Sequence, residues 1–480
     1  MKLPLHKTKI VCTIGPACRS LSSIENMVKS GMNVARLNFS HGNFHEHTDE
    51  ILNIRKVSEK LKMPVSIIID LPGVKMRIGN LKEKSLVLKK GETATLTTRN
   101  ILGTIAGISV SYKRLPESVS KGSIIYLSDG FIQLKVKEVA GTEIHCEVLI
   151  GGVLLSHKGI NLPGAKMFVN PVTAADLAAV EYGLQNGVNI FGLSFVERAA
   201  DIKKVRNFAK KMGKSVYIVA KIERREAVEN YDEILKEADA IMVARGDLGI
   251  EVPLEEVPVI QKNLIRKANL MGRPVITATQ MLGSMTQNVR PTRAEVNDVA
   301  NAILDGTDAV MLSEETAIGE YPLEAVKMMS KIALSTEGLC HSEDLSDEFD
   351  DQTTNRPKTR SSCIPDVISL NAVRAAEELK AKFILSPTSS GNTVRRICRF
   401  KPPCWILSFS TQKETCELLN FSYGVYPFLI HNIADKSKDG ILKIIRNGQL
   451  VKNGDTVVIT ERRLSPHAGE TDSLGIVTLE

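Results

Sequence analysis

The chain has 480 residues, of which 62 are basic and 55 are acidic, so its formal net charge is +7. A chain of this length exceeds what one hydrophobic core supports, and we expect two or three domains. The basic residues are scattered, which favours small anionic ligands over nucleic acid. No apolar run reaches the ~20 residues that span a bilayer. The eight cysteines include no CxxC pair, which indicates reduced thiols in a cytoplasmic protein.

Eight short apolar runs, rich in β-branched residues, predict strands that are covered on both faces. They are Lys9–Ile14, Asn33–Asn38, Val65–Asp70, Asn189–Ser194, Ser215–Ile222, Ala240–Ala244, Pro274–Thr279 and Asp308–Leu312. Segments with helical periodicity lie between most of them, as in Leu21–Ser30, Ala174–Asn186 and Arg293–Leu304. This alternation predicts a (β/α)8 TIM barrel built from residues 1–70 and 169–338.

Two other regions break this rhythm. Residues 71–168 contain short alternating strands and turn residues, which predict an inserted β domain, a small barrel over the barrel mouth that acts as a lid. The acidic stretch Cys340–Pro357 is interpreted as a linker, with a solvated helix end as the alternative. Residues 339–480 return to alternating strands and helices and predict a C-terminal α/β domain.

Charged and hydroxyl side chains follow several barrel strands, where a (β/α)8 barrel places its chemistry. Glu223 and Asp247 end consecutive strands and suit Mg²⁺, although both could be ordinary loop or capping acids. Lys221 points to the same side of its strand as Glu223 and could neutralise a phosphoryl group, or form an interior salt bridge. Gly246 and Asp247 open a predicted short helix, whose free N–H groups could hold a carboxylate.

Arg36 and Asn38 share a face of the second strand, just before Ser40 and His41, and an arginine beside a glycine-containing turn fits phosphate. His41 and His45 are four residues apart on an expected helix, but a solvated face is favoured over a zinc site. Thr279, Ser313 and Glu315 could relay a proton, or cap helices.

A hydroxyl-rich loop lies in the predicted C-terminal domain. It consists of Thr388, Ser389, Ser390, Gly391, Asn392 and Thr393. Such a loop could bind phosphate at a helix start or simply cap the helix, and both readings stay open. The segment Glu461–Ser473 could close over such a ligand.

Nine segments together carry a resemblance to one family. They are Lys9–Pro16 (KIVCTIGP), Ala35–Gly42 (ARLNFSHG), Lys158–Gly164 (KGINLPG), Lys221–Glu223 (KIE), Met242–Ile250 (MVARGDLGI), Ala278–Leu282 (ATQML), Arg290–Glu295 (RPTRAE), Asp298–Ala302 (DVANA) and Tyr321–Ala325 (YPLEA). The nine segments occur in the same order as in pyruvate kinase, and the chain resembles that family over nearly its whole length. The resemblance implies a glycolytic enzyme that transfers the phosphoryl group of phosphoenolpyruvate to ADP and then protonates the enolate to pyruvate.

The resemblance also implies residue roles. Glu223 and Asp247 would hold Mg²⁺ or Mn²⁺, and Lys221 and Arg36 would stabilise the phosphoryl group in transfer. The N–H groups of Gly246 and Asp247, with the Thr279 hydroxyl, would bind the carboxylate. Protonation would use Thr279, or water held by Ser313 and Glu315. The nucleotide would face Pro16, Asn38, His41 and Arg77.

Three departures from the family pattern change charge near the expected site. Potassium-dependent members bind the ion at the positions of Asn38, Ser40, Asp70 and Leu71. These members usually have an acid where this chain has Lys75, so we expect activity without potassium. The alternative is that Lys75 is a solvent-facing hinge lysine. Ala175 replaces a lysine that contacts ADP, which leaves the nucleotide preference open. Glu314 replaces a glycine, while Glu197, Arg224 and Arg225 alter nearby charges.

These departures keep other readings in view. A catalytically weakened regulatory paralogue is the main alternative, and another barrel enzyme acting on phosphoenolpyruvate or pyruvate is the third. By resemblance alone we also expect a homotetramer with an allosteric effector, either a sugar phosphate or AMP.

Overall fold

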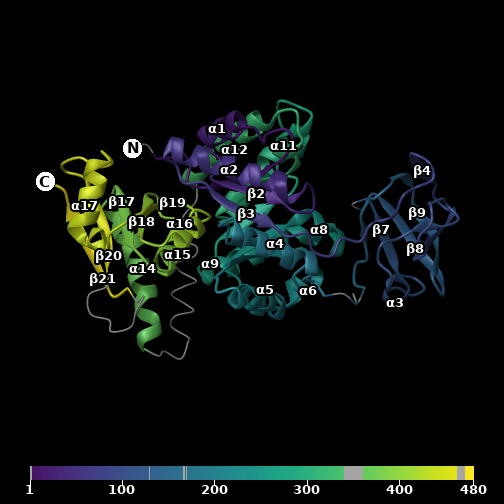
Figure 1. The fold of residues 1–480 in the computed structure, drawn as a ribbon. Helices are drawn as coiled ribbons and strands as arrows, with labels where there is room; N and C mark the ends of the chain where they lie inside the picture. The colour runs from purple at the N-terminus through teal and green to yellow at the C-terminus, as the bar shows by residue number, and fades with distance from the viewer. Residues whose placement is uncertain (1–2, 129, 166–167, 169, 340–359, 462–470) are drawn as a thin grey trace.

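A computed structural model describes residues 3–480 except 129, 166–167, 169, 340–359 and 462–470. Three bodies lie in a row, with a barrel in the centre, a β domain on one side and a C-terminal α/β domain on the other (Figure 1). The predicted linker Cys340–Pro357 and most of Glu461–Ser473 fall outside the described residues. None of the described helices has the length and apolarity that a bilayer-crossing segment needs.

Eight parallel strands close the central barrel, which confirms the predicted (β/α)8 fold. Their order around the barrel is β1-β16-β15-β14-β13-β12-β3-β2. The strands are β1 (Lys9–Ile14), β2 (Val34–Asn38), β3 (Ser66–Asp70), β12 (Ile190–Leu193), β13 (Tyr217–Ile222), β14 (Ala240–Ala244), β15 (Val275–Ala278) and β16 (Ala309–Leu312).

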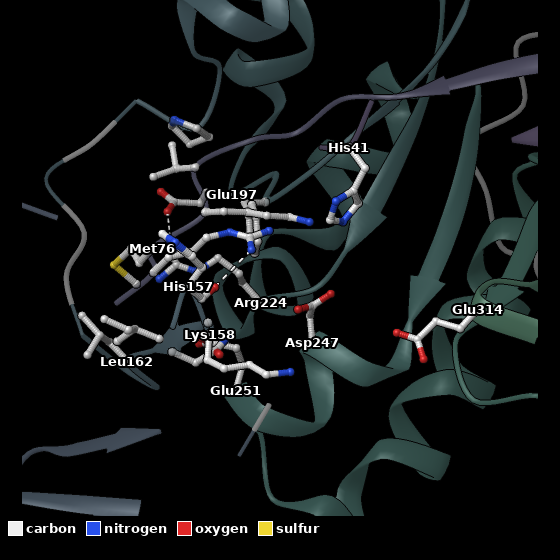
Figure 2. A pocket seen from close by; sticks show the side chains of 18 residues that line it. His41, Met76, His157, Lys158, Leu162, Glu197, Arg224, Asp247, Glu251 and Glu314 are labelled. Carbon is white, nitrogen blue, oxygen red and sulfur yellow. Dashed lines mark hydrogen bonds and ion pairs between the residues drawn. The ribbon is translucent and has the colours of Figure 1, made fainter. Parts of the chain in front are cut away.

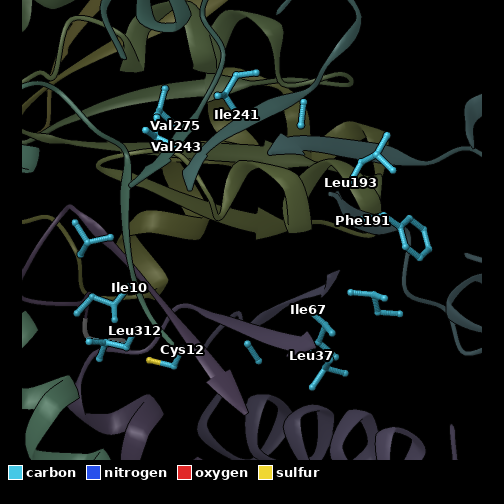
Figure 3. Close-up of a cluster of buried hydrophobic side chains, with 14 of the residues drawn as sticks. Ile10, Cys12, Leu37, Ile67, Phe191, Leu193, Ile241, Val243, Val275 and Leu312 are labelled. Carbon is cyan, nitrogen blue, oxygen red and sulfur yellow. The ribbon is translucent and has the colours of Figure 1, made fainter. Parts of the chain in front are cut away.

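The barrel strands bury both of their faces, as continuous apolar runs predict. Ile10 and Cys12 of β1 pack outward against the surrounding helices, whereas Val11 lies in the separate cluster inside the barrel. Figure 3 shows outward-facing side chains of this kind, among them Leu37 and Phe191. This alternation decides which polar residues at the strand ends point into the barrel.

Helices and short 3-10 turns surround the barrel, and local capping sets several of their starts. The RPTRAE segment is a capping box, in which the Thr292 side chain accepts from the Glu295 N–H and the Glu295 side chain accepts in return. The elements are α1 (Leu21–Ser30), α2 (Phe44–Leu61), α4 (Ala174–Gln185), α5 (Ala199–Lys211), α6 (Arg225–Glu229), α7 (Tyr231–Glu237), α8 (Arg245–Glu251), η1 (Leu254–Glu256), α9 (Val257–Leu270), η2 (Gly283–Thr286), α10 (Arg293–Leu304), α11 (Glu314–Ala317), α12 (Pro322–Thr336) and η3 (Glu337–Leu339).

One helical prediction is wrong. His41 lies outside any helix, because α2 begins at Phe44 behind the Asn43 cap and Gly42 takes a positive φ of 73°. His45 is exposed on α2, and among the described residues no group of three or more His, Cys, Asp or Glu side chains could hold a metal ion.

The lid domain is inserted between β3 and β12, as predicted. Its main sheet has the order β11-β7-β8-β9-β5-β6, and a second sheet pairs β10 with β4. The elements are β4 (Ser85–Leu88), β5 (Thr93–Thr97), β6 (Ile108–Ser109), α3 (Leu115–Ser118), β7 (Ile124–Leu127), β8 (Ile132–Ala140), β9 (Glu143–Ile150), β10 (Gly152–Leu155) and β11 (Ile160–Asn161).

The C-terminal domain is a five-stranded sheet with helices, in the order β19-β18-β17-β20-β21. Four strands are parallel, and β21 pairs antiparallel with β20. The elements are α14 (Arg360–Glu378), β17 (Phe383–Pro387), α15 (Asn392–Cys398), β18 (Trp405–Ser410), α16 (Lys413–Leu419), β19 (Val425–Leu429), η4 (Ile433–Lys436), α17 (Lys438–Asn447), β20 (Thr456–Glu461) and β21 (Ser473–Thr478). The exact domain boundaries stay a prediction.

Candidate active site

A layer of polar side chains lies inside the barrel, at the end that faces the lid. In four strands an apolar inward residue is followed two positions later by a polar one, which the period of a strand turns to the same side. The pairs are Val11 and Thr13, Val34 and Arg36, Ile68 and Asp70, and Val219 and Lys221. The fold therefore brings together residues that are up to 208 positions apart, as Thr13 and Lys221 are.

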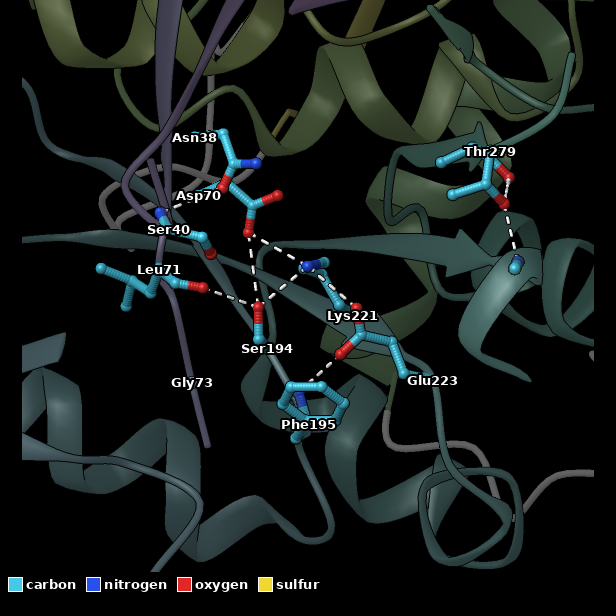
Figure 4. A network of polar contacts seen from close by, with 12 residues as sticks. Asn38, Ser40, Asp70, Leu71, Gly73, Ser194, Phe195, Lys221, Glu223 and Thr279 are labelled. Carbon is cyan, nitrogen blue, oxygen red and sulfur yellow. Dashed lines mark hydrogen bonds and ion pairs between the residues drawn. The ribbon is translucent and has the colours of Figure 1, made fainter. Parts of the chain in front are cut away.

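Asp70 is the centre of this layer (Figure 4). Its Oδ2 accepts a hydrogen bond from Arg36 Nε at 2.7 Å, and its Oδ1 lies 3.1 Å from Lys221 Nζ. Lys221 also donates to Ser194 Oγ at 2.8 Å and forms an ion pair with Glu223 Oε1 at 2.8 Å. Burial raises the pKa of Asp70, but the cations Lys221 and Arg36 outweigh it and bring the pKa to about 2.

Lys221 is buried and cationic. Burial disfavours its charge, but Asp70 and Glu223 more than offset this effect and hold its pKa above the ordinary value. The arrangement keeps a fully charged ammonium group at the base of the site at neutral pH.

Glu223 and Asp247 lie at neighbouring strand ends. Burial raises the pKa of Glu223, Lys221 lowers it, and the carboxylate of Asp247 raises it further. Glu223 Oε2 accepts from the N–H of Phe195 at 2.7 Å. Asp247 lies in the first turn of α8, which confirms the short helix expected there.

Thr279 adopts a strained backbone directly after β15. Its φ is 70° and that of Gln280 is 54°, and positive φ is rare for a β-branched residue such as threonine. Thr279 Oγ1 accepts from the Gly246 N–H at 2.7 Å, and Arg245 Nη2 donates to the Thr279 carbonyl at 2.8 Å. These contacts join the ends of β14 and β15 and hold the hydroxyl beside the start of α8.

A cleft of about 330 Å³ is lined by residues of both the barrel and the lid (Figure 2). The lid and its connections contribute Lys75, Met76, Arg77 and residues 157–162, whereas the barrel contributes His41, Phe195, Glu197, Arg224, Asp247, Glu251 and Glu314. A volume near 300 Å³ is at the lower end for small-molecule sites.

Cations gather on one wall of the cleft. Burial lowers the pKa of His41, and the positive charges of Lys75, Arg77 and Arg36 lower it further. Burial likewise lowers the pKa of Lys75, with Lys221 adding to the effect and Asp70 and Asp247 opposing it. Lys75 is exposed to solvent, but the charges of the polar layer act on it. Because this wall carries several positive charges, it suits an anion.

The connection to the lid is tied to the barrel. Leu71 N–H donates to the Gly192 carbonyl at 2.9 Å, and Gly73 N–H donates to Asp176 Oδ1 at 2.9 Å. Gly73 has a φ of 62°, and a Cβ there would lie 2.8 Å from the Phe195 ring, so a larger residue would be strained in both respects.

Other predicted residues lie in different surroundings. Asn38 Oδ1 accepts from the Ser40 N–H at 3.2 Å, and Pro16 is exposed. Glu315 is buried, and its two oxygens accept from the N–H groups of Leu282 and Ser313 at 3.1 and 2.7 Å. The acid of this turn that lines the cleft is its neighbour Glu314.

The effector loop has contacts that fit a capping turn. Gly391 has a φ of 80°, and its N–H donates to Thr388 Oγ1 at 2.8 Å. Ser389 Oγ accepts from Lys436 Nζ at 3.3 Å, and Thr393 shares a hydrogen bond of 2.5 Å with Thr471. Ser390 and Asn392 are exposed. Phosphate binding by this loop stays a prediction.

Four residues line the cleft although they were not predicted as site residues: Glu251, Lys158, Arg224 and Glu197. Arg224 and Glu197 were expected only to alter the charge near the site. Arg224 Nη1 lies 2.5 Å from Glu197 Oε1 on the barrel side of the cleft. Lys158 also lines the cleft, and its place in the KGINLPG segment could have indicated it as a site residue. Glu251 had no such signal, since only the turn of α8 brings it to the cleft.

We expect Glu251 to make the protein less stable as the pH rises. Its side chain is 8% exposed, its Oε2 has no hydrogen-bond partner among the described residues, and burial raises its pKa to about 7. Between the ordinary pKa near 4.5 and about 7 the folded chain binds more protons than the unfolded chain, so the free energy of unfolding falls across this window, by up to about 3 kcal/mol. Glu251→Gln should flatten the decline in urea-unfolding midpoint between pH 5 and pH 8, whereas Glu229→Gln, at an exposed position, should not. An unchanged slope in Glu251→Gln would contradict the assignment.

Comparisons with known proteins agree with this geometry. The profile described as "Pyruvate kinase, barrel domain" matches residues 5–326, and that described as "Pyruvate kinase, alpha/beta domain" matches residues 366–477. A pyruvate kinase of Thermococcus litoralis is 50% identical over 464 residues, which cover 96% of each chain, and one of Geobacillus stearothermophilus is 43% identical over 98% of this chain and 80% of its own length. A crystal structure of a pyruvate kinase from Cryptosporidium parvum superposes with a TM-score of 0.91 at 35% identity, over 99% of this chain and 97% of that one. The chain belongs to the pyruvate kinase family.

Proposed function

We propose that this chain transfers the phosphoryl group of phosphoenolpyruvate to ADP and yields pyruvate and ATP. The observation that carries the proposal is the polar layer in which Arg36, Asp70, Lys221 and Glu223 converge at the strand ends, beneath a lid. Phosphoryl transfer requires positioning and positive charge more than covalent help from the protein, and this layer offers both.

The residues present fit a divalent cation. Burial and the neighbouring Asp247 both raise the pKa of Glu223, and a cation between these two carboxylates would relieve that repulsion. Two carboxylates with no third protein ligand suit Mg²⁺ or Mn²⁺, which also takes oxygens from substrate and water. When bound, the ion would neutralise charge on phosphoryl and enolate oxygens.

Arg36 and Lys221 are proposed to hold the phosphoryl group during transfer. The fork of Arg36 is fixed by Asp70 on one side and by Thr13 Oγ1 at 2.8 Å on the other, and Lys221 is fixed by Asp70, Ser194 and Glu223. Because these partners set both cations before substrate binds, the site needs little reorganisation as charge develops.

The carboxylate and the transferred proton are proposed to lie on the side of β15. The N–H groups of Gly246 and Asp247 lie in the first turn of α8, where the positive end of the helix dipole favours an anion. The Gly246 N–H now donates to Thr279 Oγ1, so a carboxylate there would share this donor. Thr279, or water near Ser313 and Glu315, would deliver the proton to the enolate carbon.

The nucleotide phosphates are proposed to face Pro16, Asn38, His41 and Arg77. The lowered pKa of His41 leaves it neutral at pH 7, so it can offer a hydrogen bond while Arg77 supplies charge. Lys75 is proposed to replace a monovalent cation beside Asn38, Ser40, Asp70 and Leu71, since its pKa reflects the charges of Asp70 and Asp247. A phosphorylated effector at residues 388–393 and a homotetramer stay predictions.

Phosphorus NMR tests the proposed reaction. With Mg²⁺ and ADP, the phosphoenolpyruvate signal should convert to the γ-phosphate signal of ATP, with one pyruvate formed for each ATP. Loss of phosphoenolpyruvate without ADP would point to another barrel enzyme. No conversion, with or without sugar phosphates or AMP, would favour a regulatory paralogue.

A further inference from the structure

Two arginines from different domains meet at the end of the barrel opposite the cleft. Arg273 lies in the turn between α9 and β15, and Arg395 lies in α15 of the C-terminal domain. The two chain segments approach closely, since a Cβ on Gly272 would lie 3.8 Å from the Arg395 carbonyl oxygen. Arg395 is 8% exposed, so its guanidinium group is held within this junction.

Hydrogen bonds leave part of each guanidinium group without a protein acceptor. Arg273 Nη2 donates to the Lys236 carbonyl at 3.3 Å, and Arg395 Nη2 donates to Asn392 Oδ1 at 2.6 Å. Within the described part of the chain, Arg273 Nε, Arg395 Nη1 and Ser422 Oγ are buried and have no hydrogen-bond partner. All three residues line one small cavity of about 10 Å³.

The charge around this junction is unbalanced. Asp239 is the carboxylate that favours the charge of both arginines, and its Oδ2 already forms an ion pair with Arg206 at 2.5 Å. Asp308 also lines the cavity, but its Oδ1 is paired with Lys401 at 2.7 Å. Glu237 also favours the charge of Arg273, but it pairs with Lys203 at 3.3 Å. Four cations, Lys203, Arg206, Arg273 and Arg395, therefore face two carboxylates, Asp239 and Glu237.

An unbalanced buried charge is costly, and proteins normally pair it. Burial lowers the pKa of Arg395 to about 10, and the next largest cause is the positive charge of Arg273. The second cation lies close enough to act on the first, so a shared counter-ion would relieve both.

We propose that this junction binds a small inorganic anion, of the size of chloride, between Arg273, Arg395 and Ser422. The three unpartnered groups, two guanidinium nitrogens and one hydroxyl, belong to residues that line the same cavity, and each can donate a hydrogen bond. The cavity is close to the space that one water needs, and because chloride is slightly larger than water, the lining side chains move apart slightly to admit it. A tetrahedral oxyanion would require the domains to move apart. Because the donors come from the barrel and the C-terminal domain, the bound ion holds the two domains together.

Thermal unfolding of the full chain in sodium chloride and in sodium glutamate, at equal ionic strength, tests the proposal. A ligand that binds only the folded chain stabilises it by mass action, so we expect the midpoint to rise by about 1–3 °C for each tenfold increase in chloride above the dissociation constant. The same midpoint in both salts would overturn the proposal and assign the cavity to water.

Two variants separate this site from general salt effects. Arg395→Met should lose the chloride-dependent rise and, without chloride, should unfold at or above the wild-type temperature, because it removes an unbalanced buried charge. Arg446→Met, at an exposed arginine of the same domain, should keep the rise. A chloride-dependent rise that persists in Arg395→Met would place the ion elsewhere and overturn the proposal.

Crystals of the wild-type chain grown in sodium bromide test the site without any variant. An anomalous peak within hydrogen-bond distance of Arg273 Nε and Arg395 Nη1 is expected. A carboxylate of a second copy at this position, or no peak there, would overturn the proposal.

Discussion

Replacement of Lys221 by methionine should lower kcat by about 10³-fold or more, which corresponds to about 4 kcal/mol of transition-state stabilisation. Lys221 is the cation that contacts Asp70, Ser194 and Glu223 together, and it is held charged at neutral pH. Methionine keeps the length of the side chain but removes the charge. Steady-state rates of pyruvate formation, with the thermal midpoint measured in parallel, check the prediction.

Lys221→Arg is the informative companion. It retains the positive charge, but a planar fork cannot reproduce the three contacts of the ammonium group, so we expect a kcat between those of wild type and Lys221→Met. A Lys221→Met enzyme that is folded and within tenfold of wild-type kcat would remove Lys221 from the mechanism.

Lys75→Glu should create a requirement for potassium. Wild type is expected to have the same kcat, within twofold, in tetramethylammonium and potassium buffers, because Lys75 supplies a positive charge beside Asp70 and Asp247. The substitution reverses that charge, and we expect a loss of about 10²-fold without potassium that is largely recovered when potassium is added.

Lys75→Gln serves as the control for charge reversal. It removes the cation without adding an acid, so it should lose activity but gain less from potassium than Lys75→Glu does. A wild-type enzyme that potassium activates many-fold would contradict the assigned role of Lys75.

Much of the barrel could be predicted because each of its strands is encoded by a short, continuous stretch of sequence. The runs from Lys9 to Ile14 and from Ala240 to Ala244 became strands with the same ends, since a buried parallel strand is a continuous apolar segment. The lid was harder: β8, at Ile132–Ala140, was not predicted, and its polar residues face solvent on one side. His41 was placed on a helix by spacing alone, although Asn43 caps α2 after it.

For the candidate site, too, the sequence predicted some contacts and could not predict others. The alternation of strand residues predicted that Lys221 and Glu223 share a side, and they form an ion pair. Sequence could not show that Asp70 contacts both Arg36 and Lys221, because these contacts exist only once the barrel closes. Nor could it find the junction of Arg273 and Arg395, which depends on how two domains pack.

The proposed reaction depends on Glu223 as a metal ligand of the phosphoryl-transfer site, and a matched pair of variants tests this role. Glu223 and Glu251 are both buried, and burial raises the pKa of both, but only Glu223 is assigned to the metal. We would measure kcat/KM for phosphoenolpyruvate, together with Mn²⁺ binding by electron paramagnetic resonance, in Glu223→Gln and Glu251→Gln. We expect a loss of about 10³-fold in kcat/KM and weaker Mn²⁺ binding in Glu223→Gln, and a change in kcat/KM within tenfold in Glu251→Gln. Equal losses in the two variants, or an active Glu223→Gln enzyme, would contradict the role of Glu223 as a metal ligand.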